Sequence, residues 1–264
     1  MDAFVRVMQR RRGVRDFAPD PGRGASGVSC ASPRPVYTTH KMHLRKLADD
    51  LWIHERRLRF LGVETGARMT IVALRDGLFV HCPAPLSPAL QAEVDALGSV
   101  KAIVASSRFH HLGVQSWIDA YPGAIVCACP GLEKKRSDLR WDHILGDTPA
   151  PAWAGELDQV FFAARTLENE VVFFHPRSRS LLCADAVFNL CEHPSPVTRL
   201  VGLILANRKP GATWLERLMI RERAAGREQI DRMLAWDFDR IVLSHGPIIE
   251  HGGREVLRRA YAWL

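Results

Sequence analysis

Apolar residues occur in short runs along the chain, and turn signals or amphipathic stretches separate the runs. In the first half these runs predict strands over 51–60, 69–74, 78–81, 101–105 and 124–128. In the second half they predict strands over 159–163, 170–174, 180–183 and 239–243. The pair Asp76-Gly77 separates the second run from the third and is a strong hairpin signal.

Helical periodicity fills several of the gaps between these runs. Ser87 is a good N-cap, and Leu90, Val94 and Leu97 follow on one helical face, which predicts a helix over 87–97. Further helices are predicted over 114–121, 131–139, 213–234 and 253–264, and loops over 142–155 and 189–213. Strands therefore come in two groups, each with its own helices. This pattern favours a mixed α/β (α+β) fold such as a four-layer sandwich.

The first 40 residues differ from the rest of the chain. The stretch 19–35 is rich in Pro, Gly and Ser, a composition that buries little surface. We expect a flexible N-terminal extension over 1–40 and one folded domain over 41–264, within the usual size of a globular domain.

The formal net charge of +7 and a sequence pI of about 9.4 make the chain basic. No nucleic-acid motif accompanies that charge, so we expect no nucleic-acid partner. No apolar run reaches the ~18 residues that span a bilayer, and the first residues lack the apolar core of a secretory signal, so we expect no membrane partner. The six cysteines form no CxxC pair and fit free thiols in a reducing cytosol. We therefore expect a cytoplasmic protein.

Three polar clusters each follow a short apolar run: SSRFHHLG (106–113), LLCADAVFN (181–189) and IVLSHGP (241–247). Polar groups at the carboxyl ends of strands are where α/β folds place their ligand sites. The clusters contribute a histidine pair, an aspartate and a single histidine. Imidazole and carboxylate groups suit Zn²⁺ or iron, and a catalytic site keeps one coordination position open.

The order of these clusters resembles the metallo-β-lactamase superfamily over about 44–264, and the run LADDLWIHERRLRFLGVETGARMTIVALRDG is similar to an uncharacterised bacterial branch of it. The resemblance implies a four-layer αββα sandwich. Where the family has two leading histidines this chain has Ser106 and Arg108, and the family's later Gly-His is absent before 170–174. The first metal site of the family is therefore lost. The second site keeps ligand-capable residues at all four positions: His110, His111, Asp185 and His245.

The resemblance implies a metal-dependent hydrolase with one divalent metal ion, Zn or Fe. Its substrate would be an ester, lactone, amide or phosphoester. Asp185 would orient or deprotonate a water molecule. Arg108 would replace the missing metal as a fixed positive charge and bind an anionic group of a small-molecule substrate. Four further residues are candidates for the pocket or for contacts to the ligands: His81, Ser106, Asn189 and His193.

Several alternatives stay open at this point. The chain could be a catalytically inert ligand- or partner-binding member of the fold, or an iron protein with redox chemistry, and a homodimer is compatible with either. A serine hydrolase is disfavoured because the chain has no GxSxG motif. The GRGASG match at 22–27 has neither a strand before it nor a helix after it, so it does not indicate a dinucleotide site.

Overall fold

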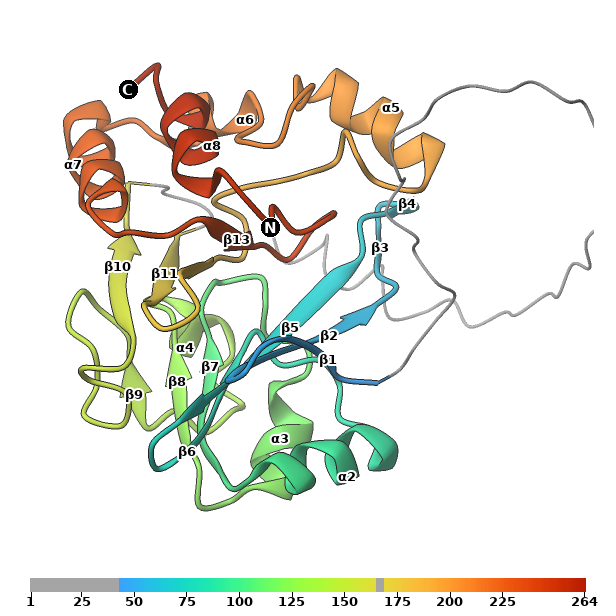
Figure 1. Ribbon diagram of the computed structural model, residues 1–264, viewed down its shortest axis with the longest axis vertical. Helices are drawn as coiled ribbons and strands as arrows, with labels where there is room; N and C mark the ends of the chain where they lie inside the picture. Colours follow the sequence, from blue (N-terminus) through green and yellow to red (C-terminus); the bar gives the residue numbers. More distant parts are fainter. Residues whose placement is uncertain (1–42, 165–168) are drawn as a thin grey trace, which may run out of the picture. The chain divides into compact units, whose positions relative to one another are not determined.

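The computed structural model describes residues 43–164 and 169–264 (Figure 1). The predicted extension over 1–40 lies outside the described residues, so that boundary stays a prediction. The strands are β1 (Arg45–Ala48), β2 (Leu51–Arg56), β3 (Arg59–Phe60), β4 (Val63–Glu64), β5 (Ala67–Leu74), β6 (Gly77–His81), β7 (Val100–Ala105), β8 (Ile125–Ala128), β9 (His143–Ile144), β10 (Asp158–Phe162), β11 (Glu170–His175), β12 (Ser180–Leu182) and β13 (Arg240–Val242). The helices are α2 (Pro88–Leu97), α3 (Val114–Ala120), α4 (Leu132–Lys135), α5 (Pro196–Ile204), α6 (Leu215–Met219), α7 (Arg223–Leu234) and α8 (Gly253–Ala260).

Two main sheets organise these elements. One has seven strands in the order β1-β2-β5-β6-β7-β8-β9, and the other has four in the order β10-β11-β12-β13. In the larger sheet the strands from β6 to β9 are parallel, and in the smaller sheet β12 pairs in parallel with β13. The short pair β3-β4 forms a separate hairpin.

The buried apolar residues form three layers of core. Alternate residues of a strand point to opposite faces of its sheet, so each strand contributes residues to two of these layers in turn. In β11, Val171 and Phe173 point into the core between the two sheets, whereas Val172 and Phe174 pack on the other face, with α7 and α8. In the larger sheet, Val80 of β6 packs toward α2 and α3.

The order of layers is therefore helix, sheet, sheet, helix, as Figure 1 also shows, with α2 and α3 on one side and α7 and α8 on the other. The predicted αββα sandwich is confirmed.

Most predicted elements appear within a few residues of their expected ends. Ser87 caps α2, and its hydroxyl accepts the backbone N–H of Leu90 at 3.2 Å. The predicted loop over 189–213 was wrong in part, because it contains α5, capped by Ser195 with Pro196 in its first turn. The predicted single helix over 213–234 is divided into α6 and α7, since Ile220 is extended. Strands β1 and β9 were not predicted, and each is a short edge strand of the larger sheet.

None of the helices in the described ranges combines the length and apolar character needed to cross a bilayer. The five cysteines of these ranges are free thiols: Cys82, Cys127, Cys129, Cys183 and Cys191.

Candidate metal centre

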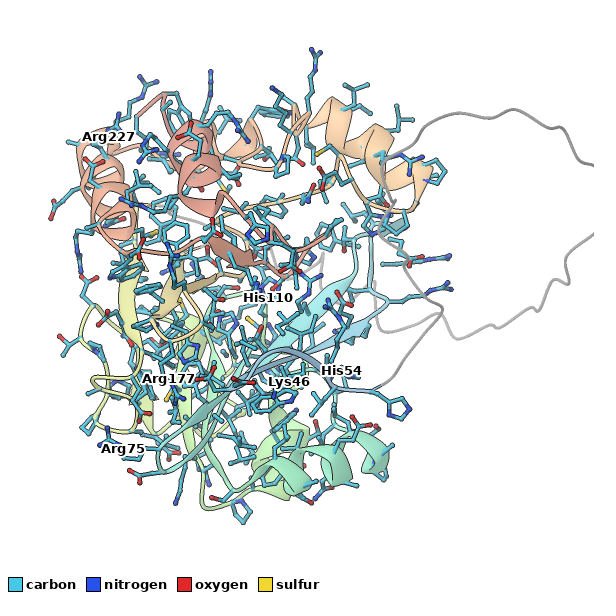
Figure 2. The ribbon with its side chains drawn as sticks, viewed as in Figure 1. Lys46, His54, Arg75, His110, Arg177 and Arg227 are labelled. Carbon is cyan, nitrogen blue, oxygen red and sulfur yellow. The ribbon has the colours of Figure 1, made fainter. Side chains whose placement is uncertain are left out.

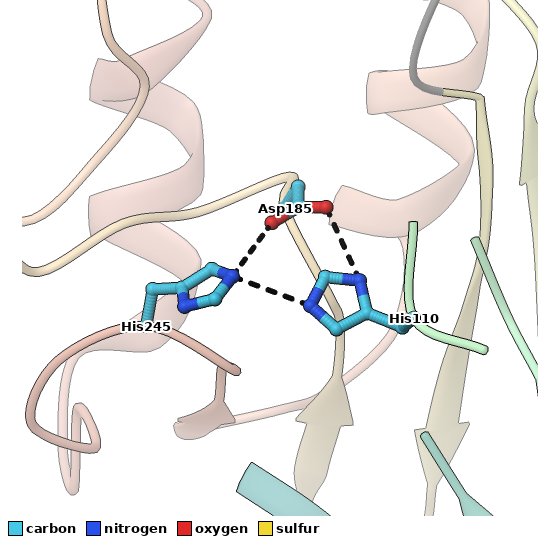
Figure 3. Close-up of side chains that lie close together, drawn as sticks. All are labelled: His110, Asp185 and His245. Atoms are coloured by element: carbon cyan, nitrogen blue, oxygen red, sulfur yellow. Dashed lines mark hydrogen bonds and ion pairs between the residues drawn. The ribbon is translucent and has the colours of Figure 1, made fainter. Parts of the chain in front are cut away.

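Three loops bring one side chain each to a common point between the sheets (Figure 3). His110 follows β7 of the larger sheet, whereas Asp185 and His245 follow the parallel strands β12 and β13 of the smaller one. One ligand atom from each residue lies within 4.8 Å of the others, and this is the one such group of histidine, cysteine or acidic residues in the described part of the chain. The parallel pairing of β12 with β13 explains why two residues 60 positions apart meet.

Two distances within the group match the separation between ligands of one tetrahedral metal ion. His110 Nε2 lies 3.2 Å from His245 Nε2, and His245 Nε2 lies 3.3 Å from Asp185 Oδ1. Bonds of 2.0–2.1 Å to zinc at tetrahedral angles separate neighbouring ligand atoms by about 3.3 Å. The two distances in the group therefore match those between ligands of one ion, and the nitrogen and oxygen donors are those that zinc and iron accept.

A backbone carbonyl fixes the ring of His245. Its Nδ1 donates to the Gly66 carbonyl oxygen at 2.9 Å, so Nε2 carries the lone pair that faces the cluster. Phe188 stacks on the same ring at 6.0 Å between centroids. Burial alone would lower the pKa of His245, but the hydrogen bond and charge of Asp185, with help from backbone groups, outweigh burial and raise the pKa.

His110 is held from its other ring nitrogen. Its Nδ1 lies 2.8 Å from Ser107 Oγ and 3.3 Å from Asp185 Oδ2. A proton on Nδ1 satisfies both contacts, and Nε2 then presents its lone pair to the cluster. Ser107 Oγ also accepts the backbone N–H of Phe109 at 3.2 Å, which fixes the loop after β7.

Two buried charged residues support the loops that carry Asp185 and His245. The sequence analysis did not single out either of these two residues. The Glu170 carboxylate, fully buried, accepts the backbone N–H groups of Ala184 and Asp185 at 2.8 and 2.9 Å. The guanidinium of Arg68 donates to the carbonyls of Leu243 and Gly246, on either side of His245. No motif signals these roles, because each acts through backbone atoms of a distant loop.

His111, the fourth predicted ligand, lies outside the cluster. Its Nδ1 lies 3.0 Å from Nη1 of Arg136 in the turn after α4, so its lone pair faces a guanidinium rather than Asp185. Burial, and after it the charges of Lys135, Arg136 and His110, lower the pKa of His111 to about 4. We therefore withdraw His111 from the ligand set. The sequence could not indicate this, since it does not show where Arg136 lies.

Arg108, two residues before His110 in the chain, lies next to α4. Its Nε is buried and has no hydrogen-bond partner, and the guanidinium approaches within 4 Å of a Cβ placed on Gly131. Lys135 donates to the backbone carbonyl of Arg108 at 2.7 Å. Arg108 and Lys135 therefore place positive charge beside Gly131, whose N–H donates to the Glu133 carboxylate, whereas Arg136 beside His111 is paired with Asp138.

The four residues predicted to line the site take different places. His81 is buried against Phe173, and Ser106 Oγ lies 3.1 Å from the thiol of Cys82. Asn189 acts through its backbone, because its N–H donates to the carbonyl of His245 at 3.1 Å. His193 is buried, and its Nδ1 accepts the backbone N–H of Ser195 at 3.1 Å. None of the four belongs to the three-residue cluster.

A hollow of about 510 Å³, lined by residues that include Asp50, Arg75 and Arg177, lies at the other end of β5 from Arg68. Figure 2 shows Arg75 and Arg177 well apart from His110. That hollow holds no candidate metal group of the described residues, so the chemistry centres on the cluster.

A family model, described as a domain of unknown function (DUF4336), matches residues 48–223. The chain belongs to this family. The match takes in His110 and Asp185 and ends before His245. No curated protein matches the chain.

Solved structures show what fold the DUF4336 chain has. A metallo-β-lactamase from Pontibacter korlensis matches with a TM-score of 0.59 and 16% identity, over 83% of this chain and 96% of that one. The metallo-β-lactamase FIM-1 from Pseudomonas aeruginosa, solved in its mono-zinc form, matches with a TM-score of 0.57 and 11% identity, over 83% and 94%.

A third match is the metal-soaked Flv1 flavodiiron core from Synechocystis sp. PCC6803, with a TM-score of 0.54 and 15% identity, over 83% of this chain and 60% of that one. The chain therefore has the metallo-β-lactamase fold, and the predicted resemblance is confirmed. At these identities the likeness concerns the fold alone, and the chemistry has to be argued from the side chains.

Proposed function

We propose that this DUF4336 chain is a metal-dependent hydrolase with a single divalent metal ion, zinc or iron, held by His110, Asp185 and His245. The observation that carries the proposal is the convergence of three donor atoms within 4.8 Å of one another, with His245 Nε2 at the separation expected between ligands of one ion from both His110 Nε2 and Asp185 Oδ1. A FIM-1 structure in mono-zinc form supports the idea that this fold holds one metal ion.

Each residue at the candidate centre has a separate role in this proposal. A divalent ion at this position supplies Lewis acidity and makes a water molecule more acidic, toward a pKa of ~7. Three protein ligands leave a fourth position open for water or substrate, as in catalytic zinc sites. Ser107 and the Gly66 carbonyl hold the two imidazole rings in place, and Glu170 holds the backbone of Asp185. Asp185 would also be the group of the cluster able to accept a proton from a water molecule held there.

The basic region around Arg108 favours a substrate with an anionic group. The buried Nε of Arg108 has no partner, and Lys135 adds further positive charge nearby, whereas Arg136 is paired with Asp138. A carboxylate or phosphate would accept charge-assisted hydrogen bonds from such a guanidinium. We therefore place anionic esters, lactones, amides and phosphoesters first among candidate substrates.

Elemental metal analysis of the purified chain tests the proposal. We expect about one zinc or iron per chain, and a loss of that metal in His110→Ala and in His245→Ala. His251→Ala is the matched control, because His251 is an exposed histidine paired with Asp239 outside the cluster. Wild-type protein that stays free of metal after reconstitution would contradict the proposal.

A melting experiment with chelator tests the main alternative, a metal-free binding protein. His110, Asp185 and His245 are close enough to hydrogen-bond one another without a metal ion. In a metalloprotein, chelator lowers the melting temperature, since a metal bound only to the folded state stabilises that state. An unchanged melting temperature with chelator supports the binding protein. A coloured, iron-loaded preparation supports an iron site.

Substrate preference tests the role of Arg108 separately. In a screen of paired neutral and anionic substrates, Arg108→Met should raise KM for the anionic member by about tenfold or more, which corresponds to one charge-assisted hydrogen bond. The neutral member should be nearly unaffected. An equal loss on both members would assign Arg108 a structural role.

A further inference from the structure

Helix α5 presents its apolar residues to solvent and its small or polar residues to the protein. Val197, Leu200, Leu203 and Ile204 lie at helical spacing on its outer face, and Leu200 and Ile204 are 58% and 67% exposed. Thr198 and Gly202 are buried on the inner face. A surface helix of a globular protein ordinarily has the opposite arrangement, with its apolar stripe against the core.

The packing of α5 fixes this orientation. A Cβ on Gly202 would lie 2.8 Å from Cβ of Leu190, so no larger side chain fits on the inner face. Thr198 Oγ1 donates to the carbonyl of Glu64 in β4 at 2.5 Å. Rotating the helix to bury its leucines would break this bond and force a side chain against Leu190.

Neighbouring segments enlarge the apolar surface. The ring nitrogen of Trp214 donates to the Ile204 carbonyl at 3.2 Å, which places this exposed indole at the end of α5. Helix α5 also contacts β4, the second strand of the β3-β4 hairpin (Figure 1). This hairpin exposes two further apolar residues, Phe60 and Leu61. We call Val197, Leu200, Leu203, Ile204 and Trp214 the outer α5 surface.

Basic residues outnumber acidic ones in the segment that carries the outer α5 surface, although the guanidinium of Arg217 lies over the ring of Trp263 in the C-terminal segment. The segment 194–221 contains five basic residues, all exposed: Arg199, Arg208, Lys209, Arg217 and Arg221. Its single acidic residue, Glu216, is buried and accepts hydrogen bonds from Thr213, so it does not neutralise them at the surface. Exposed glutamates occur just beyond the two ends, at Glu192 and Glu222.

We propose that the outer α5 surface docks on an anionic lipid bilayer. Interfacial helices combine aliphatic and tryptophan side chains on one face with lysine and arginine around them, and anionic headgroups attract the basic residues. We expected no membrane partner from the sequence, because no apolar run is long enough to span a bilayer. Peripheral docking needs no spanning segment, so the outer α5 surface revises that expectation.

Charge distinguishes the bilayer from two other occupants. A symmetric dimer through this surface would place the basic residues of one copy against the same residues of the other. The N-terminal 24 residues carry six arginines against three aspartates, so they also repel this surface. Anionic lipid complements both the apolar residues and their basic surroundings.

Docking would hold the candidate metal centre close to the lipid surface. Arg199 at the start of α5 donates to the carbonyls of His193 and Pro194 at 2.8 and 2.9 Å, so the helix is joined to the loop beside His245. The docking proposal itself does not depend on a metal ion or on hydrolysis, and it can be tested on the chain in either state.

Vesicle co-sedimentation of the full chain tests the proposal. We expect binding to vesicles of phosphatidylcholine and phosphatidylglycerol in equal parts, and far weaker binding to phosphatidylcholine alone or at high salt. Leu203→Ser with Ile204→Ser should lower the partition coefficient by about tenfold or more. Arg208→Gln with Lys209→Gln should lower it about twenty-fivefold, at roughly fivefold per charge.

Ile144→Ser is the matched control, since Ile144 is 43% exposed on the edge strand β9 and should not affect binding. The fluorescence of Trp214 provides an independent measurement. The structure describes all seven tryptophans of the chain, and Trp214 is the one that is exposed. Brominated lipid should quench part of the fluorescence in the wild type and less in Trp214→Phe.

Three results would overturn the proposal. The first is a wild type that fails to bind anionic vesicles or binds neutral ones equally well. The second is vesicle binding that the Leu203→Ser, Ile204→Ser variant retains. The third is a dimer in solution that this variant dissociates, which would make a second copy the occupant of the outer α5 surface.

Discussion

Gly246 shows how strictly one residue controls the position of His245. Its φ is +99°, and an added Cβ would overlap the carbonyl oxygen of Asn189 and lie 2.7 Å from its carbon. We expect Gly246→Ala to lower the free energy of unfolding by about 3 kcal/mol, from backbone strain plus the displaced Asn189 backbone.

Gly252 is the matched control for Gly246. It also has a positive φ, +71°, but an added Cβ meets nothing within 4 Å, so Gly252→Ala should lose only about 1 kcal/mol. Urea unfolding of both variants gives the comparison. Equal losses would show that φ alone, and not the contact with Asn189, sets the requirement at 246.

His81 makes the fold sensitive to acid. Burial, and after it the charge of His110, lower the pKa of His81 to about 3, against 6.5 for the ordinary ring. As the pH falls below about 6.5, His81 binds a proton in the unfolded chain but stays neutral in the folded chain. The free energy of unfolding therefore falls between about pH 6.5 and pH 3. From pH 6.5 to 4 this loss is on the order of 3 kcal/mol.

The variant His81→Phe should flatten the pH dependence of unfolding over that range, because it removes the titrating ring and keeps the aromatic contact with Phe173. His251→Phe replaces an exposed ring and serves as the control. Denaturant unfolding at a series of pH values measures the slope. A slope that His81→Phe leaves unchanged would assign the acid sensitivity to other groups.

At the candidate site, the sequence indicated those residues that follow strands, and it did not indicate those that act across the fold. His110, Asp185 and His245 each lie in a polar segment that follows an apolar run, and the sheet topology brings such segments together. Whether His111 would join them depends on Arg136, which arrives from a different element. Glu170 and Arg68 bind backbone atoms, and no side-chain pattern reports such contacts.

At the scale of elements, α5 is a helix whose position depends on one glycine. Gly202→Ala should lower the free energy of unfolding although alanine favours helices by about 1 kcal/mol, because the new Cβ would lie 2.8 Å from Cβ of Leu190. We expect a net loss of about 1–2 kcal/mol.

Gly226 in α7 is the matched control for Gly202, since it is also a buried glycine inside a helix. An added Cβ there meets side-chain ends, Ile220 Cγ2 at 3.0 Å and Leu264 Cδ1 at 3.3 Å, which can move. Gly226→Ala should therefore be neutral or slightly stabilising. Thermal melts of the two variants measure this difference in stability. A Gly202→Ala protein that is more stable than the wild type would mean that α5 is free to shift.

The elements that the sequence predicted well are those with a regular apolar period over a buried face. Strands β5, β7 and β11 and helix α2 are of this kind. Helix α5 was missed because its buried residues are small and its apolar residues face outward, so the usual relation between pattern and burial is reversed. Strands β1 and β9 have too few buried residues to show a period.

On the scale of the whole molecule, the candidate centre depends on how the two sheets are held together at one end. Arg68 belongs to β5 of the larger sheet, and its side chain is 5% exposed. It forms an ion pair with Glu55 of β2 and donates to the carbonyls of Leu243 and Gly246, which follow β13 of the smaller sheet. One guanidinium therefore connects both sheets around His245.

Arg68→Met should therefore have two effects. Two buried carbonyls lose their donor, which should lower the free energy of unfolding by about 3 kcal/mol. The loop that carries His245 also loses its anchor, so metal content should fall although no ligand is changed.

Arg45→Met tests whether the link between the sheets is the cause, because Arg45 pairs with the same Glu55 at 3.8 Å and is largely exposed. It should lose less than about 1 kcal/mol and keep its metal. Urea unfolding and metal analysis on the same preparations separate the effects. Full metal content in an Arg68→Met protein that is destabilised would mean that the loop after β13 holds His245 in position without help from the larger sheet.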